Sequence, residues 1–304
     1  MRLFLIKFIT IWVLVSCFNT LHAQNLNYIE GTIVDSTRNP IPYVEITFRD
    51  KGTTSWKDGT FHIELWEVKT TDTLKISCLG YETKKISIKN YLTREQNKIV
   101  LKEKSYEIEK VTVSAKKYEK KKLKKFGIFK KPAKGWYMDK TNKQIAVYIP
   151  NKNNQYGIIE NIQYFIRNQG KPDQKFRVHL YALDSINNCP GKELLPKAIY
   201  ASGTLGEEWV AVDIKEYNIE FPKSGFFISL ERLPSDPLES YITIKNKKFK
   251  VKTAKVVLGL SYENHRERLT WYFRQDKWIR EHPERRNEIA GNAMMAAEIL
   301  IYKF

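Results

Sequence analysis

The stretch GTTSWKDGTFHIEL, residues 52–65, decides the fold of the first part of the chain. After an Asp-Gly turn, apolar side chains alternate with polar ones in the order Phe61, His62, Ile63, Glu64, Leu65. Alternation with a period of two residues is typical of a β-strand that buries only one face. The stretch therefore predicts a turn followed by a half-buried strand.

The same alternation recurs at short spacing on both sides of this stretch. The further strand-like runs are YIEGTIVD (28–35), YVEITF (43–48), TLKISC (73–78) and KIVLKE (98–103). No helical period of comparable strength is present between them. About seven short strands in this space predict an antiparallel, immunoglobulin-like sandwich over residues 25–103.

Three motifs of this region resemble the carboxypeptidase regulatory-like, or transthyretin-like, domain. They are GTIVDSTRNPIPYVEI, KGTTSWKDGTFHIEL and DTLKISCLGYET, and the resemblance covers residues 29–103. It implies a seven-stranded transthyretin-like sandwich. Within these motifs, Gly59 and Gly80 suit turn positions that need a positive φ.

The resemblance does not extend to the zinc peptidases to which such domains can be attached. Their metal site commonly begins with a His followed three positions later by a Glu. None of the four histidines after the N-terminal segment has that neighbour: His62, His179, His265 and His282. We therefore expect no peptidase, no metal and no cofactor.

The N-terminus has the features of an export signal. Arg2 and Lys7 precede an apolar run, residues 8–15, which is too short to span a membrane. We expect a signal peptide over residues 1–23, cleaved after Ala23. An alternative is a lipoprotein box, LVSC, that would place a lipid on Cys17. Both predict an exported protein that is periplasmic or associated with the outer membrane.

A lysine-rich stretch, residues 104–135, follows the first domain. Its last 22 residues hold ten lysines and one acidic residue, Glu119, in a chain of net charge +18. We expect a solvated linker that repels itself and stays extended. The first part, EIEKVTVSA, resembles the segment after the same domain in TonB-dependent outer-membrane transporters, which implies an envelope location.

Contact of this stretch with an anionic surface, such as lipid or lipopolysaccharide phosphate, is the alternative. The interleaved Leu123, Phe126, Ile128 and Phe129 would then allow shallow interfacial contact. Nucleic acid is disfavoured, because the protein is expected to be exported and shows no nucleic-acid-binding fold signature. The lysines of the anionic-surface hypothesis are Lys116, Lys117, Lys120, Lys121, Lys122, Lys124 and Lys125.

Residues 136–304 contain eight or nine further strand-like runs, such as KFRVHLYALD (175–184), where Arg177, His179 and Tyr181 lie opposite an apolar face. This pattern predicts a second sandwich, jelly-roll-like and antiparallel, so that the whole chain is all-β. The segment resembles galactose-binding-like jelly rolls loosely, and resembles more closely the C-terminal halves of other exported proteins with the same first domain.

The candidates for ligand contact are the aromatic residues of LTWYFRQDKW (269–278), which also has the pattern of a β-hairpin. Exposed rings can stack on sugars, so Trp271, Tyr272 and Trp278 are possible glycan contacts. No catalytic residue is indicated, because the chain has no nucleophile elbow, phosphate loop or dinucleotide fingerprint. Cys189 is expected to be a free thiol.

Together these observations predict an exported, non-enzymatic binding or structural module of the bacterial cell envelope. Its partners would be envelope proteins, glycan or an anionic lipid surface. One alternative is a glycan-binding accessory protein that uses the C-terminal sandwich. Another is a hydrolase with a site built from the loops at residues 184–208 and 261–290.

Overall fold

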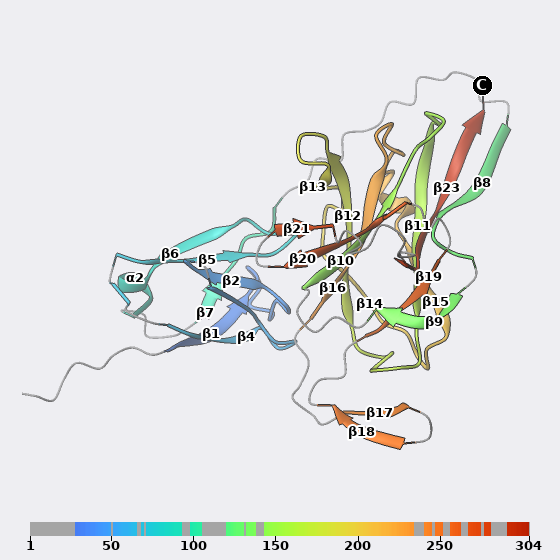
Figure 1. Ribbon diagram of the computed structural model, residues 1–304. Helices are drawn as coiled ribbons and strands as arrows, with labels where there is room; N and C mark the ends of the chain where they lie inside the picture. The colour runs from blue at the N-terminus through green and yellow to red at the C-terminus, as the bar shows by residue number, and fades with distance from the viewer. Residues whose placement is uncertain are drawn as a thin grey trace, which may run out of the picture. The chain divides into compact units, whose positions relative to one another are not determined.

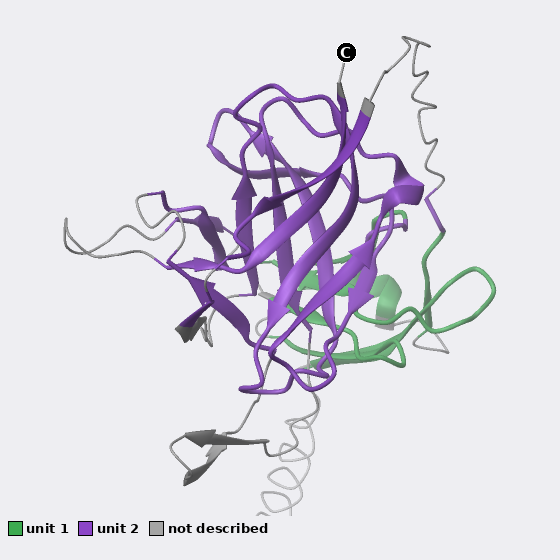
Figure 2. Ribbon diagram, turned by 90° about the vertical axis from the view of Figure 1, so that its right-hand side faces the viewer, with its two compact units in different colours: residues 1–77, 82–102 green, residues 78–81, 103–304 purple. Residues whose placement is uncertain are grey.

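The protein forms two compact units in a computed structural model (Figures 1 and 2). The first contains residues 1–77 and 82–102, and the second residues 78–81 and 103–304. The expected signal segment, with Cys17 and Ala23, lies outside the described residues. The structure describes residues 28–49, 51–65, 68–69, 71–92, 98–104, 120–130, 132–137, 143–233, 240–244, 247–251, 256–262, 267–274, 277–280 and 291–303.

The first unit is a sandwich of two sheets, which confirms the predicted seven strands. One sheet has the order β4-β1-β7 and the other β3-β2-β5-β6. A short helix, α2 (Ile88–Leu92), lies between β6 and β7 in the chain. The strands are β1 (Tyr28–Val34), β2 (Glu45–Phe48), β3 (Lys51–Thr54), β4 (Thr60–Glu64), β5 (Thr73–Ser77), β6 (Lys84–Ser87) and β7 (Lys98–Val100).

The expectation of a purely antiparallel sandwich is wrong at one pair, because β1 and β7 run parallel. The chain leaves the four-stranded sheet after β6 and enters the three-stranded sheet as β7. That change of sheet lets β7 lie beside β1 in the same direction, which a hairpin connection would not allow. The alternation predicted for β4 is confirmed, since Phe61 and Ile63 are buried and His62 is exposed.

Gly59 and Gly80 adopt the positive φ expected of them, at 77° and 94°. At Gly59 a side chain would also collide with the first sheet, because an added Cβ would lie 2.6 Å from the carbonyl oxygen of Ile33. The Asp-Gly turn therefore lets the chain pass close to β1 before β4 pairs with it.

The second unit contains two larger sheets, each of seven strands. One has the path β13-β12-β16-β10-β20-β21, with β14 beside β12. The other has the path β22-β19-β11-β23-β8, with β15 beside β11 and β9 beside β19. A separate hairpin joins β17 (Ser240–Ile244) and β18 (Lys247–Val251). We call the seven-stranded sheet that contains β12 the His179 sheet, and the one that contains β11 the Lys125 sheet.

The two large sheets contain more strands than the eight or nine predicted. In the His179 sheet they are β10 (Gln144–Ile149), β12 (Phe176–Asp184), β13 (Cys189–Glu193), β14 (Ile199–Ala201), β16 (Phe226–Arg232), β20 (Thr270–Arg274) and β21 (Lys277–Ile279). In the Lys125 sheet they are β8 (Lys120–Gly127), β9 (Pro132–Tyr137), β11 (Gly157–Ile166), β15 (Glu208–Asp213), β19 (Leu258–Ser261), β22 (Asn292–Ala293) and β23 (Met295–Lys303).

One apolar core is shared by the two large sheets. Tyr164 on β11 of the Lys125 sheet packs edge-on against Phe176 on β12 of the His179 sheet, and both rings are fully buried. Burying a side chain of this size contributes about 1.5–3 kcal/mol. Because alternate residues of each strand enter this core, the intervening residues lie on the outer faces of the two sheets, turned away from it.

The expectation that residues 104–135 form only a linker is wrong for part of the stretch. Residues 120–127 form β8, which pairs antiparallel with β23 over its whole length. Ile128 is fully buried in the core, and Phe126 packs against the same core and against Phe221. These two apolar residues therefore anchor the strand, and Ile128 is not available for contact with a lipid surface.

The lysines of β8 have a structural explanation of their own. β8 is the last strand of its sheet, and in the described part of the chain no strand pairs with its second edge. Lysines on an edge strand oppose pairing with further strands of other molecules.

In the described residues, no helix is long and apolar enough to cross a membrane.

Candidate functional site

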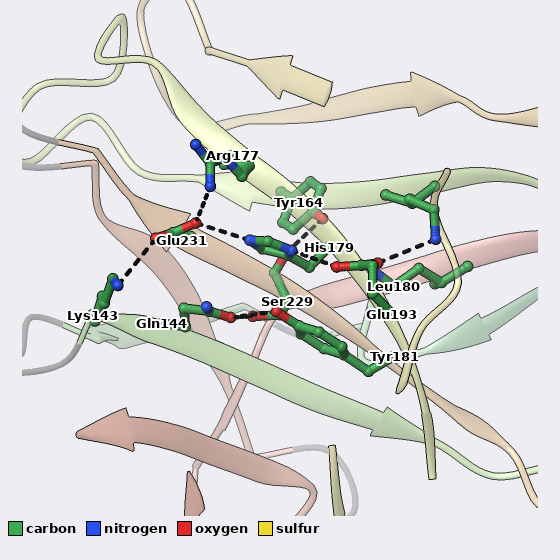
Figure 3. A network of polar contacts seen from close by, with 11 residues as sticks. Lys143, Gln144, Tyr164, Arg177, His179, Leu180, Tyr181, Glu193, Ser229 and Glu231 are labelled. Atoms are coloured by element: carbon green, nitrogen blue, oxygen red, sulfur yellow. Dashed lines mark hydrogen bonds and ion pairs between the residues drawn. The ribbon is translucent and has the colours of Figure 1, made fainter. Parts of the chain in front are cut away.

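The most polar buried group of the second unit lies on the outer face of the His179 sheet. On β12, Val178 and Leu180 enter the core, so Arg177, His179 and Tyr181 lie on the opposite face. Strand register then places Glu231 of β16 beside Arg177, and Glu193 of β13 beside Tyr181. We call the group the His179 network; it consists of Lys143, Gln144, Arg177, His179, Tyr181, Glu193, Ser229 and Glu231 (Figure 3).

His179 lies between two carboxylates at the centre of the network (Figure 3). Its Nδ1 is 2.6 Å from Glu193 Oε2, and its Nε2 is 2.9 Å from Glu231 Oε2. An ionised carboxylate can only accept hydrogen bonds, so both ring nitrogens must donate. The geometry therefore holds His179 as a buried imidazolium.

Both carboxylates have further partners. Glu193 Oε1 accepts from the backbone N–H groups of Leu180 and Leu195, at 3.0 and 3.2 Å. Glu231 Oε2 forms an ion pair with Arg177 Nη1 at 3.2 Å, and its Oε1 lies 3.9 Å from Lys143 Nζ. Each buried negative charge is thus matched by positive charge or by donors, which is the condition under which buried ions are tolerated.

A neutral branch continues the network across the same face. Gln144 Oε1 accepts from the Tyr181 hydroxyl at 3.0 Å and from Ser229 Oγ at 3.2 Å. From the core side, the Tyr164 hydroxyl donates to the backbone carbonyl of Ser229 at 3.0 Å. The branch links three neighbouring strands, β12, β16 and β10, beside the charged part.

The electrostatic environment shifts the pKa values of the central pair in opposite directions. Burial alone would lower the pKa of His179, but the hydrogen bonds and charges of Glu193 and Glu231 outweigh it and raise the pKa to about 9. Burial alone would raise the pKa of Glu231, but Arg177 and then His179 lower it to about 2. At neutral pH this histidine is charged and this glutamate is ionised.

These shifts limit the chemistry that the network can perform. A general base needs a free lone pair, and His179 has none while both of its nitrogens donate. A general acid of the glycosidase type needs a carboxyl whose pKa is raised, whereas that of Glu231 is lowered. Among the described residues, no group of three or more His, Cys, Asp or Glu side chains could hold a metal ion.

A group of aromatic rings lies on the same outer face, beside the network. We call it the aromatic cluster. The Trp278 ring lies 5.8 Å from Tyr181 of the network and 5.1 Å from Phe273. The Trp271 ring lies 6.1 Å from Phe227, and the Arg280 guanidinium is 5.8 Å above it. The cluster consists of Tyr148, Tyr181, Phe227, Trp271, Phe273 and Trp278.

The predicted ligand contacts divide between the two faces of one hairpin. The β20–β21 pairing confirms the hairpin predicted from LTWYFRQDKW. Trp271 and Trp278 lie on the outer face and are half-buried. Tyr272 was wrongly grouped with them, because it alternates with Trp271 along β20 and is a core residue, only 5% exposed.

The lysines of the anionic-surface hypothesis differ in their structural setting. Lys116 and Lys117 lie outside the described residues, and Lys120, Lys121, Lys122, Lys124 and Lys125 belong to β8. Lys121 and Lys122 are exposed. Lys124 donates to Gln155 at 3.0 Å, and Lys125 lies over the ring of Trp209, 4.4 Å from its centre. Lys121 also lies over a ring, that of Tyr302, 5.1 Å from its centre, so three of the five are engaged with neighbouring side chains.

The His179 network was not predicted as a site. The prediction that Arg177, His179 and Tyr181 share one face of a strand is correct, but Glu193 was expected in a long loop. A signal was present, since Ser229 and Glu231 alternate with core residues in the same manner as Arg177 and His179. Only the pairing of β12 with β13 and β16 brings these residues together.

Comparisons with known proteins identify the family of the first domain. Residues 29–113 match the family model of the CarboxypepD_reg-like domain. No curated protein matches the chain. The chain is similar to a crystal structure of the cysteine protease and lectin-like domains of Cwp84, a surface layer associated protein of Clostridium difficile, with 10% sequence identity and a TM-score of 0.33. That match covers 59% of this chain and 36% of that one. From the family match, residues 29–113 contain a CarboxypepD_reg-like domain.

Proposed function

We propose that the protein is an exported, non-enzymatic binding module of the bacterial cell envelope. In this proposal, the second unit binds a glycan through the aromatic cluster, and the His179 network holds the supporting strands in register. The signal-like N-terminus and the family of the first domain support an envelope role.

The observation that carries the proposal is the state of the polar groups beside the cluster. His179, Glu193 and Glu231 have the composition of an acid–base site, yet each is engaged with the others or with backbone donors. Burial also raises the pKa of the Cys189 thiol, which reduces the fraction of nucleophilic thiolate. Such an arrangement suits a rigid scaffold better than a reacting centre.

The aromatic cluster supports a glycan as the ligand. Trp271 and Trp278 are half-buried rings on paired strands, a rigid setting that fixes their orientation at little cost in entropy. Arg280, exposed and close to Trp271, adds a donor of the kind that hydroxyl and carboxylate groups accept.

Equilibrium binding to a panel of soluble polysaccharides tests this proposal. We expect saturable binding that Trp278→Ala weakens about tenfold, because a stacked ring contributes on the order of 1–2 kcal/mol. Tyr262→Ala is the matched control, since Tyr262 is an exposed aromatic residue of the same unit, 47% accessible. Equal binding by the wild type and Trp278→Ala would contradict the assignment of the cluster.

The hydrolase alternative predicts turnover in place of simple binding. The glycans that bind would then be shortened on incubation with the protein, and Glu193→Gln or Glu231→Gln would abolish the reaction. We expect every bound glycan to be recovered at its original length. Release of reducing ends by the wild type, lost in either variant, would overturn the non-enzymatic assignment.

A further inference from the structure

A second polar group lies on the outer face of the other sheet, the Lys125 sheet. Ile162 and Tyr164 of β11 enter the core, so Asn161 and Gln163 lie on the outer face. Asn161 Nδ2 donates to Glu298 Oε2 of β23 at 2.6 Å, and Gln163 Nε2 donates to Asn161 Oδ1 at 3.0 Å. We call these three residues the amide ladder.

The carboxylate at one end fixes the direction of every hydrogen bond in the amide ladder. Glu298 can only accept, so the NH₂ group of Asn161 must face it. The Asn161 oxygen then faces Gln163 and must accept from the Gln163 NH₂ group. Flipping either amide would place two acceptors or two donors opposite each other.

With the hydrogen bonds of the amide ladder fixed in this direction, one acceptor is left without a donor. Gln163 is only 8% exposed, yet its Oε1 has no hydrogen-bond partner among the described residues. A buried acceptor without a donor costs about 1–3 kcal/mol, which a donor from a bound molecule would recover. The oxygen is turned away from Asn161, because the NH₂ group of the same amide faces that residue.

Two larger side chains lie on the same face of the sheet as this oxygen. Lys125 is paired with Glu298 across β8 and β23, and its Nζ reaches to 4.4 Å from the centre of the Trp209 ring on β15. Strand order places Gln163 of β11 between them. Ala296, the cross-strand neighbour of Gln163, is small and leaves the lysine side chain room to cross. A cation, an aromatic ring and an unused acceptor thus lie on one face of the same sheet.

We propose that this face of the Lys125 sheet binds an acidic saccharide. A sugar hydroxyl donates to Gln163 Oε1, the ammonium of Lys125 pairs with the acidic group, and the ring of Trp209 lies against the sugar. The exposed Lys121 and Lys122 on β8 extend the positive charge along the strand. The site shares no residue with the aromatic cluster on the other sheet, so it stands whether or not that cluster binds a ligand.

Binding of the full chain to three polymers at one ionic strength tests the proposal. Polygalacturonate carries hydroxyls and carboxylates, poly-L-glutamate carries only carboxylates, and dextran carries only hydroxyls. We expect polygalacturonate to bind most tightly. Equal affinity for poly-L-glutamate would reduce the interaction to charge alone and would overturn the proposal.

The Gln163→Leu variant isolates the unused acceptor. We expect it to bind polygalacturonate about tenfold more weakly, because the acceptor for the sugar hydroxyl is removed. Gln174→Leu, in a loop of the same unit, is the control and should bind as the wild type does. A Gln163→Leu variant that folds and keeps full affinity would contradict the proposal.

A second variant keeps the proposal testable if Gln163→Leu does not fold. Lys125→Met retains the aliphatic part of the side chain and removes the charge. We expect it to lose the preference for polygalacturonate over dextran, whereas Lys175→Met, at an exposed loop lysine, keeps it. An unchanged preference in Lys125→Met would overturn the role of the ammonium, and with it the choice of an acidic ligand.

Discussion

At the scale of single residues, His179 is notable because its neighbours fix its charge. Two carboxylates accept from its two ring nitrogens, so the folded state favours its protonated form. A folded-state pKa of about 9 stands against 6.5 for an unperturbed histidine. Folding and protonation of this side chain are therefore linked, and the stability of the second unit depends on pH.

The sign of the linkage gives the first prediction. The raised pKa of His179 contributes stability that is fully present below pH 6.5 and is lost as the pH rises through about 9. The lowered pKa of Glu231 contributes stability present above pH 4.5 and lost as the pH falls towards 2. The free energy of unfolding from these two groups should therefore be greatest between pH 4.5 and 6.5.

Urea denaturation at a series of pH values measures this effect. We expect a decline on the order of 3 kcal/mol between pH 6.5 and 9 that is absent in His179→Gln. His62→Gln, at an exposed histidine of the first unit, should keep the decline. If His179→Gln declines as much as the wild type does, the imidazolium assignment is wrong.

At the scale of elements, β8 shows where sequence reasoning ends. Lysine density indicated a solvated linker, because a strand with charges on both faces has no alternating pattern. The edge position of β8 explains how so charged a segment can form a strand, since an edge strand needs only a few apolar contacts, here from Phe126 and Ile128. By contrast, β4 and β12 were predictable from alternation alone, because each buries one whole face.

The second prediction concerns the anchoring of β8. Ile128→Ala should destabilise the second unit by roughly 2–5 kcal/mol, because Ile128 is fully buried in the core. Leu123→Ala, on the same strand but 47% exposed, should cost less than about 1 kcal/mol. Chemical denaturation of both variants checks this. Equal, small effects would mean that residues 120–128 do not form part of the sheet.

The candidate sites were likewise predictable only in the features that depend on local alternation. The alternation of Arg177, His179 and Tyr181 was readable, and so was the hairpin that carries Trp271 and Trp278. The partners were not, because Glu193 and Glu231 reach His179 only through strand pairing between distant segments. The face of each side chain was set by local alternation, whereas its partner was set by topology.

At the scale of the whole molecule, the net charge of +18 and the proposed export give the last prediction. The proposed envelope location allows two attachments, a lipid on Cys17 or electrostatic contact of the mature protein after cleavage at Ala23. Electrostatic contact weakens with salt, because the Debye length falls to about 3 Å in 1 M salt, whereas a lipid anchor resists salt and yields to detergent. We expect the protein to leave the membrane fraction in 1 M NaCl, and Cys17→Ser to behave in the same way. Retention in salt that is lost in Cys17→Ser would instead establish lipid attachment.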